Sequence, residues 1–146
     1  MIEIVVPGAP VPKGRPRFTS QGGFARTFTP KATAEYERKV AGIARSVMIG
    51  KQILTCPVKV DITAFMPIPV SMPKYKKEMA VKQALLPAKK PDIDNLAKAA
   101  LDALNGICFA DDNLICALNL RKVYAENSRL EIQIEKIKEA ENEIIG

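Results

Sequence analysis

Four segments of the chain have the composition or the alternation of apolar and polar residues that is typical of β-strands. The first, "IEIVV" at residues 2–6, is followed by Pro7 and Gly8, which favour a break. The second, "CPVKVDITAFM" at residues 56–66, is predicted to direct Val58, Val60, Ile62 and Ala64 inward and Lys59, Asp61 and Thr63 outward. The last two, "ICALNLRKVYA" and "RLEIQIEKI", are separated by the polar turn "ENS", which predicts a β-hairpin.

Between the first two strands, the spacing of apolar residues predicts an amphipathic helix. Thr29 is predicted as its N-cap, Pro30 as its first helical residue and Gly50 as its stop. Its apolar stripe is predicted to consist of Tyr36, Val40, Ile43, Ala44 and Val47.

The composition fits one globular domain spanning residues 1–146, with 47% apolar and 26% charged residues. No apolar run approaches the roughly 20 residues that span a bilayer, and the N-terminus lacks a leader, so we expect a cytosolic protein. The sequence contains no histidine, which excludes zinc–histidine sites and Ser–His triads. Three cysteines, Cys56, Cys108 and Cys116, form no CxxC pair and are predicted to be reduced core residues.

The net charge of +6 is unevenly distributed along the chain. Residues 1–90 contain 16 basic and 5 acidic residues, a net +11, whereas residues 91–146 contain 6 basic and 11 acidic residues, a net −5. A basic surface attracts polyanions, most often nucleic acid, with an anionic lipid surface as the alternative. Because no amphipathic lipid-facing helix is evident, we expect a nucleic-acid partner.

Basic residues concentrate in three places. The loop 8–26 carries arginines and lysine beside Phe18 and Phe24, which favours an arm that grips phosphates over a solvated loop; its basic residues are Lys13, Arg15, Arg17 and Arg26. The predicted helix carries Lys31, Arg38 and Arg45 along one flank, where solvation explains them as well as DNA contact does. The Pro- and Lys-rich insertion 67–91, with a short helix predicted after Pro73, ends in Lys89 and Lys90. It is interpreted as a mobile basic insertion, or as a solvent-exposed connector without ligand.

A second helix is predicted within "KKPDIDNLAKAALDALNG", residues 89–106, with Asp94 as the N-cap and Gly106 as the stop. Its buried side is predicted to consist of Leu96, Ala99, Ala100, Ala103 and Leu104. Asp94, Lys98 and Asp102 share one flank, and Asp102 is expected to hold Lys98 in place.

Capping and helix pairing leave Asp92 unexplained, and a further acidic pair, Asp111 and Asp112, follows at a predicted turn in "FADDNLI". These four acids can converge on a divalent cation, since Mg²⁺ is typically held by carboxylates, water and substrate phosphate. An acidic site in a basic protein favours a metal-dependent nuclease over a non-catalytic nucleic-acid-binding module.

The segments "KPDIDNLAKAALDALNG" and "ADDNLI" resemble the RusA family of Holliday-junction resolvases, and "VPKGRPRF" is similar to the N-terminal segment of its phage and prophage members. The likeness spans roughly residues 3–135. It implies an α+β domain, with a small mixed sheet packed against two main helices, that acts as a homodimer and cuts branched DNA with Mg²⁺, or Mn²⁺, as cofactor.

The resemblance also implies roles for individual residues. Asp92 and Asp94 match the family's paired metal-binding aspartates, Lys98 its essential lysine and Asp112 its further catalytic acid, with Asp111 as a neighbour that contacts the metal or its outer shell. DNA contacts are expected from Lys13, Arg15, Arg17, Arg26, Lys89 and Lys90. The expected activity is the resolution of Holliday junctions by paired symmetrical nicks in recombination and repair; a protein that binds branched or single-stranded DNA without catalysis, and a nuclease preferring flaps or forks, are the alternatives.

Overall fold

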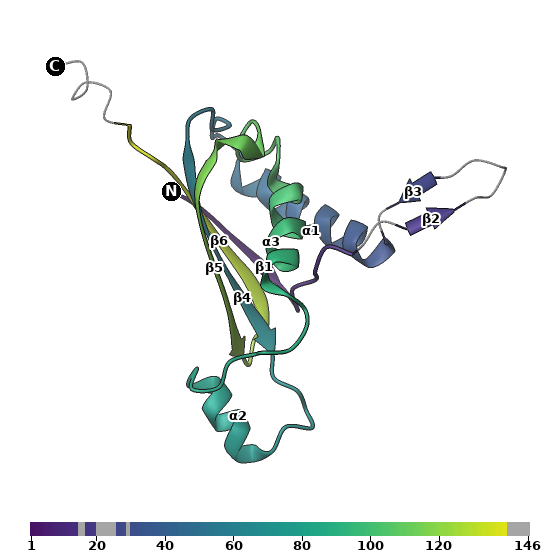
Figure 1. The fold of residues 1–146 in the computed structure, drawn as a ribbon. Helices are drawn as coiled ribbons and strands as arrows, with labels where there is room; N and C mark the ends of the chain where they lie inside the picture. Colours follow the sequence, from purple (N-terminus) through teal and green to yellow (C-terminus); the bar gives the residue numbers. More distant parts are fainter. Residues whose placement is uncertain (15–16, 20–25, 29, 140–146) are drawn as a thin grey trace.

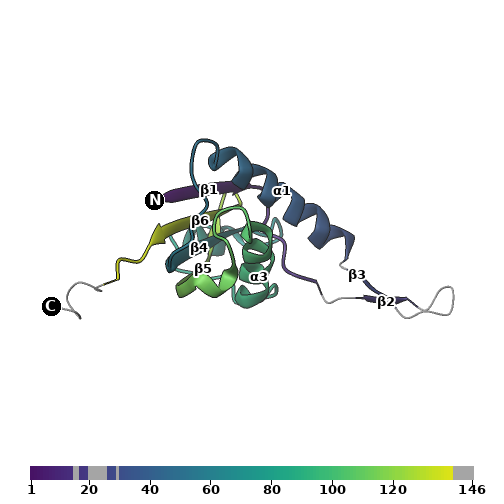
Figure 2. The same cartoon turned by 90° about the horizontal axis from the view of Figure 1, so that it is seen from above.

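The computed structural model describes residues 1–14, 17–19, 26–28 and 30–139. Its centre is a four-stranded mixed sheet in the order β1-β6-β4-β5 (Figure 1). The strands are β1 (Ile2–Pro7), β4 (Val58–Pro67), β5 (Ile115–Ala125) and β6 (Arg129–Lys136). Two helices, α1 (Lys31–Val47) and α3 (Ile93–Leu104), pack on one face, and no helix of the described residues lies on the other (Figures 1 and 2). The α+β class, with a mixed sheet and two main helices, is confirmed.

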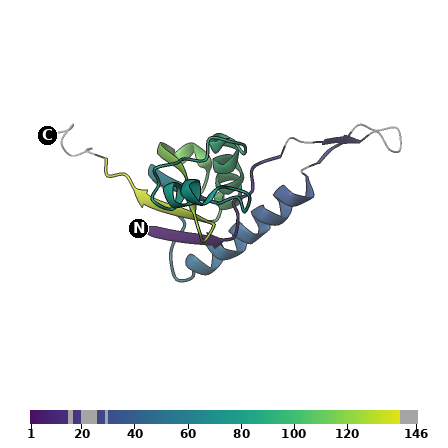
Figure 3. The ribbon, with the colours of Figure 1, turned by 90° about the horizontal axis from the view of Figure 1, so that it is seen from below.

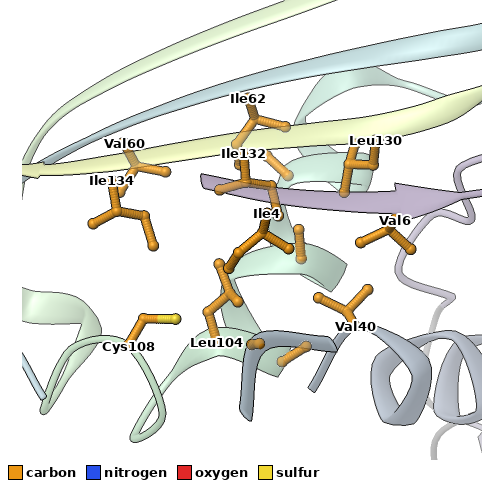
Figure 4. Close-up of a cluster of buried hydrophobic side chains, with 14 of the residues drawn as sticks. Ile4, Val6, Val40, Val60, Ile62, Leu104, Cys108, Leu130, Ile132 and Ile134 are labelled. Carbon is orange, nitrogen blue, oxygen red and sulfur yellow. The ribbon is translucent and has the colours of Figure 1, made fainter. Parts of the chain in front are cut away.

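The core lies between the sheet and these two helices, because β1, β4 and β6 turn alternate apolar residues to the same side. The predicted alternation in β4 is confirmed: its four inward residues are buried, while Lys59 is exposed and Asp61 and Thr63 are half-buried. In β1 and β6, the isoleucines and valines at every second position are likewise buried. Figure 4 shows these side chains meeting Val40 of α1, Leu104 of α3 and Cys108.

The predicted hairpin of β5 and β6 is wrong, although both strands exist. β4 lies between them, antiparallel to β6 and parallel to β5, so the turn 126–128 connects strands that are not neighbours. Alternation and turn residues locate strands, but pairing is decided by which strand best fills the centre of the sheet. β4 fills it because its inward side chains are buried from Val58 to Met66.

Helix α1 begins one residue later than predicted. Pro30 has a ψ of 144°, which is extended, so it is the cap residue and Lys31 is the first helical residue; Thr29 lies outside the described residues. The apolar stripe is confirmed: Tyr36, Val40 and Ala44 are buried, and Ile43 and Val47 pack against the core. Gly50 ends the segment with a φ of +77°, a left-handed conformation that favours glycine.

The predicted loop 8–26 contains regular structure. Two short strands, β2 (Arg17–Thr19) and β3 (Arg26–Phe28), pair antiparallel and form a hairpin that projects away from the sheet (Figures 1 to 3). We call this hairpin the arm. In the insertion 67–91, the helix predicted after Pro73 is confirmed as α2 (Lys74–Val81).

The three cysteines are free, but only Cys108 is a core residue. Burial raises the pKa of its thiol to about 11. Cys56 is half-buried. Cys116 is exposed, because it lies near the start of the edge strand β5. In the described part of the chain, the helices are all too short or too polar to cross a membrane.

Candidate active site

The start of α3 holds Asp92 and Asp94. The helix is fixed by its buried side, which includes Leu96, Ala100 and Leu104 as predicted, together with Ala97. Asp92, with a ψ of 144°, is the cap residue and Asp94 lies in the first turn, so the prediction of Asp94 as N-cap is wrong. The shift arises because Ile93 already has helical geometry, leaving the extended Asp92 as the boundary.

The carboxylates of Asp92 and Asp94 are exposed. Within the described residues, the side chain of Asp92 accepts no capping hydrogen bond from the helix. Asp92 and Asp94 line one wall of an open depression of about 690 Å³, which we call the acidic groove. Four cations line the same groove, namely Lys89, Lys90, Arg121 and Lys122. Asp92 also lines an adjacent depression of about 470 Å³ with Lys13 and Asn95.

Two of these cations, Arg121 and Lys122, were not predicted as site residues from the sequence. They lie in β5, and only the position of this strand beside the start of α3 brings them to the acidic groove. The dipeptide "RK" within a predicted strand was the available signal, but the strand's neighbours were assigned incorrectly.

Lys98 is exposed on α3, four residues after Asp94 and therefore about 6 Å further along the helix axis. The prediction that Asp102 pairs with Lys98 is wrong. Asp102 Oδ2 lies 3.2 Å from Nζ of Lys13 instead. Lys13 reaches it from the loop after β1, a contact between segments distant in sequence that helix spacing does not reveal.

Asp111 and Asp112 lie at the other end of α3. Asp111 caps the short 3₁₀ helix Asp112–Leu114 by accepting a hydrogen bond of 2.9 Å from the backbone N–H of Asp112. This 3₁₀ helix precedes Ile115, whereas the acidic groove meets β5 at Leu120 to Lys122. At about 3.3 Å per residue, Ile115 and Arg121 are roughly 20 Å apart. One protomer therefore brings Asp92 and Asp94 together but leaves Asp111 and Asp112 at a distance.

The donors at the acidic groove fit a hard divalent cation. In the described part of the chain, no three Asp, Glu or Cys residues are grouped as metal ligands. Mg²⁺ does not require such a cage, because it is often held by one or two carboxylates, water and substrate phosphates. The two exposed carboxylates of this open groove meet that description.

The residues predicted to contact DNA are placed differently from one another. Lys89 and Lys90 line the acidic groove, and Arg17 and Arg26 belong to the two strands of the arm. Arg15 lies outside the described residues. Lys13, in contrast, is half-buried and pairs with a carboxylate of each helix.

Lys13 joins the base of the arm to α1 and α3. Its Nζ lies 2.5 Å from Glu37 Oε1 in addition to its contact with Asp102, and its backbone N–H donates to the carbonyl of Asn95. The next residue, Gly14, donates its N–H to Thr33 Oγ1, and a Cβ at Gly14 would lie 2.8 Å from Pro30 Cγ. Burial alone would lower the pKa of Lys13, but the two carboxylates outweigh it and raise the pKa above 10.5.

Replacing Lys13 by methionine is expected to lower the free energy of unfolding by about 1–3 kcal/mol, because two carboxylates then lose a shared charged donor. Chemical denaturation measures this change. The control is Lys31→Met, which removes the exposed pair of Lys31 with Glu35 and should leave stability near wild type. Because the folded-state pKa of Lys13 is raised, its contribution is fully present below pH 10.5 and disappears only above that pH. Equal effects of both variants would contradict a structural role for Lys13.

One comparison with known proteins confirms the resemblance in the sequence, and a second finds a relative of similar length. A family model described as "Endodeoxyribonuclease RusA" matches residues 7–135. The chain is also 36% identical over 138 residues to a protein of Bacillus subtilis (strain 168) called "Uncharacterized protein YqaN". That match covers 93% of this chain and 96% of the relative. Both acidic pairs, the arm and the acidic groove fall within the matched residues.

Proposed function

Because the chain belongs to the RusA family of endodeoxyribonucleases, we propose that it resolves Holliday junctions by paired, symmetrical nicks that depend on Mg²⁺. Family membership makes it a nuclease of a group that acts on branched DNA and requires a divalent metal. The observation that supports the finer proposal is the acidic groove itself, where two carboxylates at a fixed helix start lie among four cations.

Each part of the acidic groove has a role in the proposed reaction. Asp92 and Asp94 bind Mg²⁺, or Mn²⁺, which when bound supplies an activated water and neutralises charge on the phosphate. The cations Lys89, Lys90 and Arg121 hold the DNA backbone against the groove. Lys98, one turn beyond Asp94, stabilises negative charge that develops on the phosphate.

Asp112 enters the proposal through dimerisation. A four-way junction has approximate two-fold symmetry, and two matched nicks require two identical sites, which a two-fold homodimer provides. Since one protomer separates Asp112 from Asp92 by the length of α3, about 18 Å, a site that uses both acids needs a second copy of the chain. We therefore propose that each site combines Asp92 and Asp94 of one protomer with Asp112 of the other, and that Asp111 keeps its capping role.

A panel of labelled DNA substrates tests the proposal directly. Pure protein is incubated with a four-way junction, a flap, a fork and a linear duplex, with and without Mg²⁺, and the cut positions are mapped. Paired nicks near the crossover, only with metal and fastest on the junction, are the expected result. Binding without cleavage would identify a non-catalytic DNA-binding protein, and faster cutting of flaps or forks would replace the junction as the preferred substrate.

A further inference from the structure

Lys122 makes two hydrogen bonds that no part of the proposed reaction uses. Its Nζ donates to the carbonyl of Lys89 at 2.8 Å and to the carbonyl of Pro91 at 2.9 Å. Lys122 is half-buried in β5, where it pairs in register with Ala64 of the central strand. The side chain of Lys122 therefore links strand β5 to the backbone just before α3.

The two carbonyls bound by Lys122 lie directly before the metal-binding candidate Asp92. The carbonyl of Pro91 belongs to the peptide bond that leads directly into Asp92. On the other side, the carbonyl of Asp92 accepts a hydrogen bond of 3.2 Å from the backbone N–H of Leu96, the first bond of α3. Asp92 is thus fixed from both directions, by the helix after it and by Lys122 before it.

A lysine side chain is well suited to bind two backbone carbonyls at once. An ammonium group has three donors, and hydrogen bonds from a charged donor are stronger than neutral ones. Without it, the carbonyls of Lys89 and Pro91 lose this shared donor, and the backbone directly before Asp92 loses its two hydrogen bonds to the sheet. Asp94 needs no such help, because it lies within the first turn of α3.

We propose that Lys122 is a positioning residue for metal binding, which holds the backbone before Asp92 so that the carboxylates of Asp92 and Asp94 meet one cation. This inference rests on the proposed function, because it assumes that these carboxylates bind the metal. Partners that orient metal ligands typically change metal affinity about 10–100-fold when they are removed.

Charge and positioning predict opposite results, which makes the inference testable. Removing any cation from the acidic groove should, by charge alone, strengthen the binding of another cation. Lys122→Met removes the charge together with the two hydrogen bonds, whereas Arg121→Met removes a charge from the same groove and leaves those bonds intact. Lys122→Arg keeps the charge and supplies new donors.

The direct measurement is Mn²⁺ binding to the intact protein without DNA, followed by electron paramagnetic resonance. We expect Lys122→Met to weaken Mn²⁺ binding about 10-fold or more. Arg121→Met should bind as tightly as wild type or more tightly, and Lys122→Arg should restore most of the affinity. In nicking assays, Lys122→Met should need more Mg²⁺ but approach the wild-type rate at saturating metal. Hydrogen exchange should be faster at the backbone N–H of Leu96 in Lys122→Met, because this group donates to the carbonyl of Asp92.

Each other outcome overturns something specific. If wild type binds Mn²⁺ and nicks DNA but Lys122→Met binds Mn²⁺ equally well or better, Lys122 is not a positioning residue and the proposed function stands. Equal weakening in Lys122→Arg and Lys122→Met would reject hydrogen bonding as the cause and overturn the assignment. A wild type that neither binds Mn²⁺ nor nicks DNA would overturn the proposed function and this inference together. If Lys122→Met does not fold, Lys122→Gln takes its place, because it removes the charge and shortens the donor. Weaker Mn²⁺ binding than in Arg121→Met then supports the assignment, and binding as tight as in Arg121→Met contradicts it.

Discussion

Asp92→Asn is expected to abolish cleavage of a four-way junction while leaving junction binding unchanged or stronger. The variant removes one of the two carboxylates that the acidic groove offers to a metal. Loss of the bound metal costs several kcal/mol of transition-state stabilisation, which corresponds to a rate decrease of about 10³-fold or more. Binding survives because the change also removes a negative charge that would face the phosphates. Nicking rates and gel-shift titrations measure the two effects separately.

Glu3→Gln is the matched control for this prediction. Glu3 is an exposed carboxylate on β1, at the opposite edge of the sheet from β5, so its neutralisation changes net charge by the same amount without touching the acidic groove. It should nick at the wild-type rate. Normal cleavage by Asp92→Asn in Mg²⁺ would remove Asp92 from the active site.

A mixed dimer of Asp92→Asn and Asp112→Asn protomers is expected to nick DNA, although each variant alone is inactive. If each site takes Asp92 and Asp94 from one protomer and Asp112 from the other, both substitutions fall in the same site and the second site is intact. One intact site makes single nicks, so nicked junctions should accumulate in place of resolved products. Co-expression with two different affinity tags and sequential purification provides the mixed dimer for a nicking assay.

A mixed dimer of Asp92→Asn and Asp94→Asn protomers is the control, because these two acids lie together at one end of α3. Each site then carries one substitution, and the control should be inactive. If the dimer of Asp92→Asn with Asp112→Asn is inactive as well, the acids do not combine across protomers. A chain that stays monomeric at working concentration would contradict the dimer itself.

The sequence predicts the secondary elements of this protein well, because burial of one face imposes a period on each segment. The alternation around Ile62 and the stripe around Val40 are local consequences of where the core lies. Strand pairing is not local, and the separation of β5 from β6 by β4 depends on competition between strands distant in sequence. The predicted helix starts also differ by one or two residues, at Pro30 and Asp92. Thr29 is a more usual cap residue than Pro30, and Asp92 and Asp94 suit a cap equally well, so composition alone does not decide.

The pair of acids at the start of α3 was predictable from the sequence, but its position relative to the other two acids was not. Asp92 and Asp94 are close in sequence and lie in one groove, as expected. The distance from Asp92 to Asp112 depends on the length of α3 and on the direction of β5. The direction of β5 was not predicted, because β5 was expected to pair with β6. Lys13 shows the same limit, because its pairing with Glu37 and Asp102 joins segments that are distant in sequence.

The parallel pairing of β4 and β5 means that residues 68–114 form one crossover connection, which carries α2, α3 and both acidic pairs. The entropy cost of closing a flexible loop grows only with the logarithm of its length, by about 0.6 kcal/mol for each doubling. The exposed turns of the lysine-rich stretch can therefore lengthen or shorten at little cost to the sheet, provided that Lys89 and Pro91 keep their contacts with Lys122. Helix α3 has no such freedom, because its buried side is matched to the strands beneath it. A single connection thus joins a part of fixed length, which carries the acids, to a part of variable length, which carries the lysines.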